Sequence, residues 1–302
     1  MTFSGGEMMN IQWYPGHMTK ARRMMQENIK LIDLIIEFVD ARAPLASRNP
    51  DIDELGKGKA RLILLNKADL ASDCWNHAWE SWFKAKGYFV VRLDSRSKAG
   101  MKSIQNVIKE ACREKIERDR KRGILNRPVR AMVAGIPNVG KSTFINSFAG
   151  RACAKTGNKP GVTRGAQWIR LNKQVELLDT PGILWPRFDD QEAGIHLAFL
   201  GSVNDEILNL QELAGRLGCF LQEHFPSCLE ERYKTEFLED PEEHMILTKV
   251  AEARSCLTKG GELDIDRAAV FLLDDFRSGR LGKITLEFPP EGEYDKNMDS
   301  MR

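Results

Sequence analysis

The chain has 302 residues, of which 42% are hydrophobic, which suits one ordinary domain with a smaller second one. Its six cysteines are scattered without a C-x-x-C pair, so we expect neither a zinc site nor a disulfide framework. No apolar run reaches membrane-spanning length and the first ten residues lack a signal core, so we expect a cytoplasmic protein with no membrane partner. The net charge of +2 hides an asymmetry, since residues 201–302 carry 12 Lys or Arg against 22 Asp or Glu, and the basic remainder indicates either a polyanion-binding body or an ordinary solvated surface.

The N-terminal stretch combines two aromatic residues, a Pro-Gly break and a histidine in Trp13-Tyr14-Pro15-Gly16-His17. His17 begins a predicted helix that runs to about residue 30 and carries several basic side chains. Its local sequence allows either a plain polar turn residue or a functional group. An apolar run over residues 34–40 then predicts a buried strand, followed by a loop and a short helix over residues 51–55.

A second strand, over residues 61–65, ends in the motif N-K-x-D, formed by Asn66, Lys67, Ala68 and Asp69. The Asp69 carboxylate can accept hydrogen bonds from N1–H and the 2-amino group of guanine. Adenine offers neither donor, so an unpaired carboxylate would oppose its binding. We expect Asn66 to tie this loop to a phosphate loop and the Lys67 stem to pack on the base.

Four large aromatic residues follow at helical spacing, namely Trp75, Trp79, Trp82 and Phe83. We interpret them as core rather than as a platform for RNA bases. A strand over residues 88–93 leads to Asp94 and Ser95, a weak candidate for a second guanine-contacting loop. One long helix is predicted over residues 101–121, and its basic tail, residues 118–122, either touches phosphate or is a solvated helix end.

The strongest motif, Gly135–Ser142, reads G-x-x-x-x-G-K-S between a predicted strand at 129–134 and a helix at 143–149. This context is that of a phosphate-binding loop, in which backbone N–H groups and a helix N-terminus face phosphate oxygens. Lys141 can reach the β- and γ-phosphates and the Ser142 hydroxyl can ligate Mg²⁺. The predicted nucleotide-binding residues here are Asn138, Val139, Gly140, Lys141, Ser142 and Thr143.

Two further loops complete the predicted site. Thr163 lies in a loop after the phosphate-loop helix, where a threonine completes the Mg²⁺ shell. A hairpin over residues 168–178 then delivers Asp179 and Gly182 of a D-x-x-G element. Asp179 can hold a Mg²⁺-bound water, and the Gly182 amide can bond the γ-phosphate. The next residue, Ile183, cannot orient the attacking water as a glutamine would, so unassisted hydrolysis should be slow.

The order of these motifs predicts the fold class: an α/β P-loop GTPase domain with a mainly parallel sheet, circularly permuted so that the base loop precedes the phosphate loop. A closed sheet with neighbouring termini tolerates such a permutation. Amphipathic stretches after residue 205 predict a small all-helical C-terminal domain. We place the GTPase domain at 11–200, the helical domain at 205–288 and a disordered acidic tail at 289–302.

The ordered set of motifs closely resembles the circularly permuted GTPases of the ribosome biogenesis GTPase A (YlqF) family, over nearly the whole chain. Besides the loops above, the resemblance includes residues 13–18, Asp40-Ala41-Arg42 and the stretch 179–186. It implies a bacterial GTPase that acts on the large ribosomal subunit precursor, binds GTP and GDP, contacts ribosomal RNA rather than DNA, and is stimulated by the particle. It also implies His17 as a candidate catalytic residue, Thr163 and Gly182 at the γ-phosphate, and Asn138 as a candidate K⁺ ligand beside Mg²⁺.

Alternatives from other classes remain. A GTP-dependent adaptor that binds RNA or protein would hydrolyse little GTP, and a GTPase serving RNA modification would need a further catalytic cluster, which the sequence does not display. The acidic C-terminal domain is either an RNA-contacting module, through residues such as Arg254, Lys259, Arg277 or Arg280, or a structural or protein-binding module.

Overall fold

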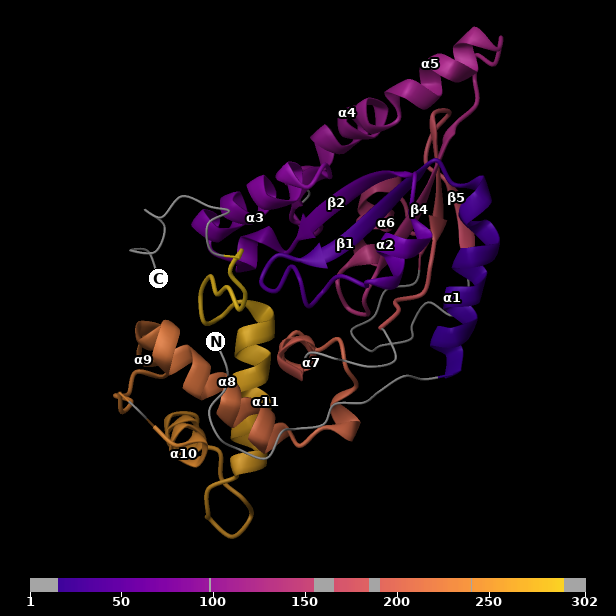
Figure 1. Ribbon diagram of the computed structural model, residues 1–302. Coiled ribbons are helices and arrows are strands. Elements are labelled where there is room, and N and C mark those ends of the chain that lie inside the picture. Colours follow the sequence, from indigo (N-terminus) through magenta and orange to yellow (C-terminus); the bar gives the residue numbers. More distant parts are fainter. Residues whose placement is uncertain (1–15, 98, 155–165, 185–190, 240, 291–302) are drawn as a thin grey trace.

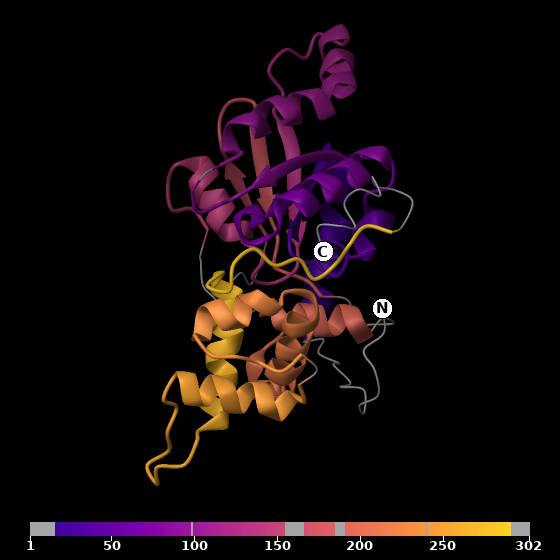
Figure 2. The same cartoon turned by 90° about the vertical axis from the view of Figure 1, so that its left-hand side faces the viewer.

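The computed structural model describes residues 16–97, 99–154, 166–184, 191–239 and 241–290. The chain forms a six-stranded sheet with helices on its faces, and a separate cluster of helices packs below one edge of that sheet (Figure 1). Seen from the side, the two parts are stacked, with the last described segment running between them (Figure 2). Within the described residues, no helix is both long enough and apolar enough to span a bilayer.

The sheet is mainly parallel, as predicted, and its strand order is β3-β2-β1-β4-β6-β5. Among the strand pairs of the described residues, the antiparallel one is β5–β6, the predicted hairpin. The central strand β1 is buried along its whole length, which accounts for its unbroken apolar run. The strands are β1 (Leu34–Asp40), β2 (Ala60–Asn66), β3 (Phe89–Leu93), β4 (Val129–Gly135), β5 (Gln167–Arg170) and β6 (Val175–Asp179).

The register brings the ends of the inner parallel strands to one edge. Asp40 at the end of β1 pairs with Asn66 at the end of β2, and Val133 of β4 pairs with Asp179 of β6. Because ligands bind outside the carboxyl ends of such strands, this edge is where the predicted loops should meet.

Helices cover both faces of the sheet, and α3 fills a second core with its aromatic residues. Trp75, Trp79, Trp82 and Phe83 are all buried there, which confirms their interpretation as core. The helices of this part are α1 (Gly16–Asn28), α2 (Asp51–Leu55), α3 (Asp73–Ala85), α4 (Met101–Ala111), α5 (Arg113–Lys121) and α6 (Lys141–Ala149), with short 3₁₀ turns η1 (Ile29–Leu31) and η2 (Ala68–Leu70). Helix α7 (Gln191–Phe199), which the turn η3 (Asp205–Ile207) follows, packs against the helices of the C-terminal part (Figure 1).

The expected single helix over residues 101–121 is wrong, because the chain breaks it into α4 and α5. Cys112 leaves helical geometry, with φ −105° and ψ 14°, while its side chain stays buried in the core. After the break, Lys115 lies 3.2 Å from the carboxylate of Asp33, an ion pair that ties α5 back to the start of β1. Residue periodicity could not reveal the break, since the apolar spacing continues through it.

The C-terminal part is helical, as predicted, and consists of α8 (Leu210–His224), α9 (Pro226–Tyr233), α10 (Glu243–Ala253) and α11 (Ile265–Ser278). The helices α8 and α10 approach closely because two glycines face the contact. A Cβ on Gly215 would lie 2.6 Å from Glu243 Cβ, and one on Gly218 would lie 2.6 Å from Ile246 Cγ2. We call helices α8–α11 the helical region.

After α11 the chain returns to the sheet as an extended segment, residues 281–288, which we call the C-terminal strap (Figure 2). Its backbone N–H at Ile284 donates to the Leu70 carbonyl at 3.0 Å, and the Phe288 ring lies 4.7 Å from that of Trp75. The domain limits 11–200, 205–288 and 289–302 stay predictions, but this segment contacts the GTPase part rather than only the helices before it.

Candidate nucleotide-binding site

The phosphate loop lies between β4 and α6, as its motif requires. Gly135 and Gly140 have backbone φ angles of 152° and 100°, values that residues with a Cβ atom rarely adopt. Space is also limited, since a Cβ on Gly135 would lie 2.7 Å from the Phe38 carbonyl oxygen and one on Gly140 would collide with Asn66 Nδ2. The two glycines are therefore required by both conformation and packing.

Lys141 begins α6 with its side chain buried. Its Nζ donates to the carbonyl oxygens of Gly135 at 2.9 Å and Ile136 at 2.7 Å, so the ammonium lies within the curve of the loop. Burial lowers its pKa to about 8, against the opposing effect of the Asp179 carboxylate. This is the placement from which a P-loop lysine reaches the β- and γ-phosphates.

Asp179 ends β6 beside the phosphate loop. Burial raises its pKa to about 6, although the Lys141 charge works in the other direction. Its Oδ1 is buried and has no hydrogen-bond partner in the described part of the chain. Two residues further along, the Gly182 Cα is so close to the loop that a Cβ there would lie 2.7 Å from the Pro137 nitrogen. The D-x-x-G element therefore lies directly on the phosphate loop.

A divalent cation fits this arrangement. An unsatisfied buried carboxylate oxygen is costly, and Mg²⁺ or a Mg²⁺-bound water would satisfy it. The described residues contain no cluster of three or more His, Cys, Asp or Glu side chains suited to a metal. Ser142 and Asp179 would therefore hold the ion together with nucleotide phosphates, as P-loop proteins do, rather than in an all-protein cage.

The base loop joins the phosphate loop through Asn66. Its Nδ2 donates to the Val139 carbonyl at 2.7 Å, which is the tie expected from the sequence. Its Oδ1 accepts from the backbone N–H of Ser95 at 3.2 Å and from the Ser95 hydroxyl at 2.8 Å. One buried side chain thus brings together the N-K-x-D loop, the loop after β3 and the phosphate loop.

The other members of the base loop lie around this junction. Lys67 adopts a left-handed conformation, with φ 58°, and its Nζ lies 2.9 Å from Asp40 Oδ2. Asp69 lies in the turn η2 with its side chain partly exposed, and its partial desolvation and the nearby Asp94 charge both raise its pKa. The Asp94 Oδ1 accepts the Arg96 backbone N–H at 2.8 Å, so this carboxylate caps its own turn. Base contacts by these residues stay predictions.

Two predicted residues cannot be placed fully. Thr163 lies outside the described residues. His17 lies in the first turn of α1, while the described side chains begin after it. The candidate K⁺ ligand Asn138 is described, and its Nδ2 donates to the Gly201 carbonyl at 2.6 Å, in the turn after α7. The neighbouring Ser202 hydroxyl donates to the Pro137 carbonyl at 3.0 Å.

Reasoning from the sequence missed the contacts of the phosphate loop with Gly201 and Ser202. It also missed the ion pairs that Asp40 makes with Arg42 and Lys67. A charged pair directly after a buried strand, at the sheet edge that carries N-K-x-D, was the available signal for Asp40. No motif pointed to Gly201 or Ser202, because a turn between helices gives no distinctive pattern.

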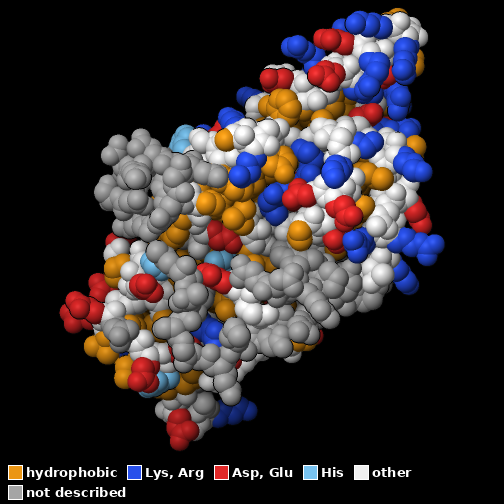
Figure 3. Space-filling model, in the orientation of Figure 1, with side chains coloured by type: hydrophobic (Ala, Val, Ile, Leu, Met, Phe, Trp, Pro, Cys, Tyr) orange, Lys and Arg blue, Asp and Glu red, His pale blue; other side chains and the backbone are white. Residues whose placement is uncertain are grey.

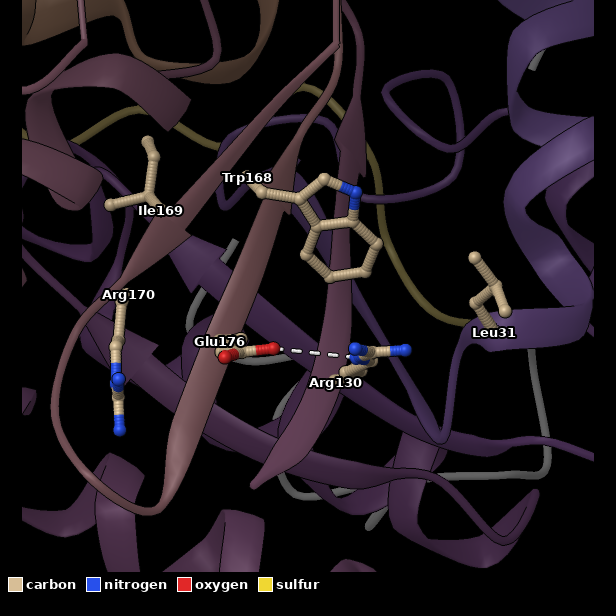
Figure 4. Close-up of a pocket in the computed structure, with 6 residues that line it drawn as sticks. All are labelled: Leu31, Arg130, Trp168, Ile169, Arg170 and Glu176. Atoms are coloured by element: carbon tan, nitrogen blue, oxygen red, sulfur yellow. Dashed lines mark hydrogen bonds and ion pairs between the residues drawn. The ribbon is translucent and has the colours of Figure 1, made fainter. Parts of the chain in front are cut away.

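A surface pocket lies near the N-terminal ends of β4 and β6, opposite the strand ends that carry the nucleotide loops (Figure 4). It has a volume of about 240 Å³ and is lined by Leu31, Arg130, Trp168, Ile169, Arg170 and Glu176. Arg130 stands near the start of β4, whereas the phosphate loop follows the end of that strand. In the close-up, the Arg130 guanidinium faces Glu176, 3.3 Å away, beneath the Trp168 ring. This pocket is therefore separate from the nucleotide loops.

Comparisons with known proteins agree with the geometry. The family model described as "50S ribosome-binding GTPase" matches residues 130–242. Ribosome biogenesis GTPase A of Bacillus cereus is 47% identical over 97% of this chain and 99% of that protein, and that of Thermotoga maritima is 31% identical over 93% and 95%. The crystal structure of GNP-bound YlqF from Thermotoga maritima superposes with a TM-score of 0.64 at 26% identity, covering 89% of this chain and 98% of that one.

The fold and its loops define a circularly permuted P-loop GTPase with a helical C-terminal region. The similarity to the relatives identifies the family within this class, because it extends through the helical region as well as the nucleotide loops. The chain belongs to the ribosome biogenesis GTPase A family. It binds guanine nucleotides and hydrolyses GTP with a divalent metal, and its role is that of a GTPase assembly factor.

Proposed function

We propose that this GTPase binds the precursor of the large ribosomal subunit in its GTP state and leaves after hydrolysis, in the bacterial cytoplasm. The observation that carries the proposal is the junction of the guanine and phosphate loops at Asn66, in a chain with full-length likeness to ribosome biogenesis GTPases. The matched description "50S ribosome-binding GTPase" supports the choice of the large subunit.

Contacts at both ends of the segment from Gly182 to α7 support a route by which the γ-phosphate would alter the helical region. Gly182 lies against the phosphate loop, and helix α7 follows only a short distance along the chain. Arg277 of α11 holds the end of α7, since its Nε donates to the Phe199 carbonyl at 3.0 Å and its Nη2 to the Ala198 carbonyl at 2.8 Å. Contacts of Gly182 with a γ-phosphate would be lost on hydrolysis, and that change can pass through α7 to α11.

The RNA-contacting surface that we favour is the end of α5. Helices α4 and α5 extend beyond the sheet as an arm, and basic side chains gather at its tip (Figures 1 and 3). The described residues record no ion pair for the four cations there, which are Arg118, Arg120, Lys121 and Arg122. Unpaired, exposed cations suit ribosomal RNA, because each phosphate contact releases counterions.

The helical region offers fewer such cations than its sequence indicated. Arg254 and Arg280 both bond the buried carboxylate of Asp275, and Arg277 pairs with Asp205 at 2.7 Å. These arginines hold the region together, so we assign it chiefly to transmitting the nucleotide state.

Hydrolysis by the isolated chain should be slow, because the position after D-x-x-G is the buried Ile183. The particle would then supply or order the missing assistance. His17 and a K⁺ ion at Asn138 are the candidates that the family resemblance supplies, and equal turnover in Na⁺ and K⁺ would reject the ion.

The deciding experiment measures GTP turnover by the full chain with and without large-subunit precursor particles, and co-sedimentation with those particles in GDP and in a non-hydrolysable GTP analogue. We expect particle-stimulated turnover and analogue-dependent co-sedimentation. Co-sedimentation without stimulation would favour the rival adaptor, and co-sedimentation independent of nucleotide would reject the switch. Stimulated turnover retained by His17→Ala would remove that residue from catalysis.

A further inference from the structure

Asp40, at the end of β1, is a buried carboxylate with both oxygens in use. Its side chain is 1% exposed, and its Oδ2 lies 2.9 Å from Lys67 Nζ. Arg42 binds the same carboxylate in a bidentate manner, donating from Nε to Oδ1 and from Nη2 to Oδ2, each at 2.9 Å. Burial works against the charge of Asp40, yet Arg42 and Lys67 together hold its pKa well below the usual range. The carboxylate is thus charged and fixed.

The fixed carboxylate sets the direction of the Lys67 side chain. Lys67 has φ 58°, a conformation unfavourable for a lysine unless its surroundings hold it. The Asn66 carbonyl also accepts the Ala41 backbone N–H at 2.9 Å, so the two loops are joined by their backbones as well. Lys67 is the residue whose stem is expected to lie on the guanine ring.

Arg42 connects this pair to the helical region. Its guanidinium is 1% exposed, lies 5.0 Å from the centre of the Phe276 ring, and donates from Nη1 to the Phe276 carbonyl at 3.3 Å. That carbonyl belongs to the last turn of α11, where it also accepts the Gly279 N–H at 3.1 Å and where a nearby cation is favourable. The Arg42 carbonyl in turn accepts the Leu286 N–H of the strap at 2.7 Å.

The strap holds the base loop from its other end. The Ile284 N–H donates to the Leu70 carbonyl, directly after Asp69, and the Ser72 N–H donates to the Thr285 hydroxyl at 3.2 Å. A Cβ on Gly279 would collide with Leu70 Cδ2. The N-K-x-D loop is therefore enclosed by Asp40 and Arg42 on one side and by the strap on the other.

We propose that Asp40 and Arg42 are positioning residues for guanine recognition, and that they link guanine binding to the docking of α11 and the strap. Asp40 orients Lys67 for the base, and Arg42 ties that carboxylate to the end of α11. Because this link starts at the base, GDP operates it as well as GTP. It therefore differs from the γ-phosphate route through Gly182 and α7, and coupling between two sites acts in both directions.

The first test is a double-mutant cycle on nucleotide affinity in the full chain, using Asp40→Asn and Lys67→Met. We expect Asp40→Asn to weaken GDP and GTP equally, by about tenfold, with kcat at saturating GTP unchanged. In the Lys67→Met background, Asp40→Asn should have a much smaller effect, because the orientation of that lysine is already lost. Losses that multiply, or an Asp40→Asn variant that binds as tightly as the wild type or more tightly, would overturn the proposal.

The control removes another buried ion pair from the same strand. Glu37 is three residues before Asp40, and its ion-pair partners, Arg61 at 2.7 Å and Arg48 at 3.2 Å, are not residues of the nucleotide loops. Glu37→Gln should lower thermal stability without changing nucleotide affinity. An equal loss of affinity in Glu37→Gln would mean that general destabilisation explains the Asp40 result, and the positioning role would fall.

The second test follows amide hydrogen exchange at Gly279, Ile284 and Leu286 in the nucleotide-free, GDP and GTP-analogue states. These three N–H groups donate to Phe276, Leu70 and Arg42 respectively. We expect GDP and the analogue to slow their exchange equally, and Arg42→Lys, which loses the two-pronged grip, to abolish the effect. Protection by the analogue alone would assign the coupling to the γ-phosphate and overturn the link.

If Arg42→Lys does not fold, Thr285→Val tests the same link from the strap. It removes the acceptor of the Ser72 N–H at nearly constant volume. We expect about threefold weaker binding of both GDP and GTP. Unchanged affinity for both nucleotides would show that docking of the strap does not support the base loop.

Discussion

Asn66 and Val139 are joined by a 2.7 Å hydrogen bond from the side-chain amide of one to the backbone carbonyl of the other, although 73 positions separate them in the chain. Asn66 belongs to the base loop and Val139 to the phosphate loop. Because both groups are buried, this bond fixes the distance between the places where the base and the phosphates bind. The base loop precedes the phosphate loop in this circularly permuted chain, and this contact brings the two together in the fold.

The first prediction concerns Asn66 itself. Asn66→Ala leaves the Val139 carbonyl and the Ser95 donors without their partner in a buried place. We expect GDP and GTP affinity to fall together by about ten- to a hundredfold. Equilibrium titration with a fluorescent nucleotide measures the change, and Asn146→Ala, whose amide bonds the Ala154 carbonyl, is a control away from the base loop. Affinity within twofold of the wild type would contradict the role given to this bond.

The second prediction tests base selection by Asp69. Asparagine there offers an N–H donor where guanine also presents donors, so Asp69→Asn should weaken GTP by about a hundredfold or more. Xanthine carries a carbonyl in place of the 2-amino group, and XTP should bind the variant better than GTP. Competition between GTP and XTP for both proteins gives the answer. A variant that still prefers GTP would mean that Asp69 does not face the base.

Much of this site was accessible from the sequence because each nucleotide loop follows a strand. Apolar runs located β1, β2, β4 and β6, and parallel strands necessarily end at one edge. The motifs then supplied the chemistry, and the tie from Asn66 to the phosphate loop appears as expected.

What the sequence could not supply was long-range pairing of common residues. Nothing in the pattern distinguishes Arg277, which caps α7, from Arg254, which bonds Asp275. The return of the strap onto Leu70 also had no signal, since a short extended segment after a helix resembles any tail. Such contacts depend on tertiary geometry rather than on local preference.

The third prediction concerns Asp275, whose buried carboxylate bonds three arginines and the Tyr233 hydroxyl at 3.1 Å. Burial opposes its charge, but hydrogen bonds from Arg232, Arg280 and Arg254 lower its pKa to about 2. Asp275→Asn should cost about 2 to 4 kcal/mol of unfolding free energy at pH 7, because it breaks a buried ionic network.

The pH dependence of that loss has a definite sign. A carboxyl whose folded pKa lies below its ordinary 3.8 contributes stability above that value and loses it as the pH falls toward 2. The difference between the wild type and Asp275→Asn should therefore be constant from pH 5 to 8 and shrink below about pH 4. Urea unfolding across this range measures it, and a difference that grows in acid would contradict the assignment.

The fourth prediction is that Asp179 supports Mg²⁺-dependent hydrolysis but lowers the stability of the metal-free protein. Since burial raises its pKa from 3.8 to about 6, its ionisation at neutral pH costs folding free energy when no metal is bound. Asp179→Asn should raise the melting temperature of the metal-free protein by a few degrees at pH 7.5 while weakening Mg²⁺-dependent GTP hydrolysis.

The pH dependence of Mg²⁺ affinity provides a second test of Asp179. Below about pH 6 the Asp179 carboxyl takes up a proton, so the apparent affinity for Mg²⁺ should fall in the wild type. Asp179→Asn lacks this ionisation and retains only the pH dependence of the nucleotide phosphates. Identical pH profiles of Mg²⁺ affinity in the two proteins would exclude Asp179 from the metal site.

The fifth prediction concerns the cationic tip of α5. Replacing Arg118, Arg120, Lys121 and Arg122 with alanine should weaken binding to large-subunit precursor particles and flatten its salt dependence. The slope of log affinity against log salt should decrease by about 0.7 to 0.9 for each phosphate contact removed, because fewer counterions are released. The GDP affinity should not change, since this tip lies far along the arm from the nucleotide loops (Figure 1). A matched control removes Lys249 and Lys259 from the acidic helical region, and an equal loss of slope per charge there would show that the α5 tip is not the RNA-contacting surface.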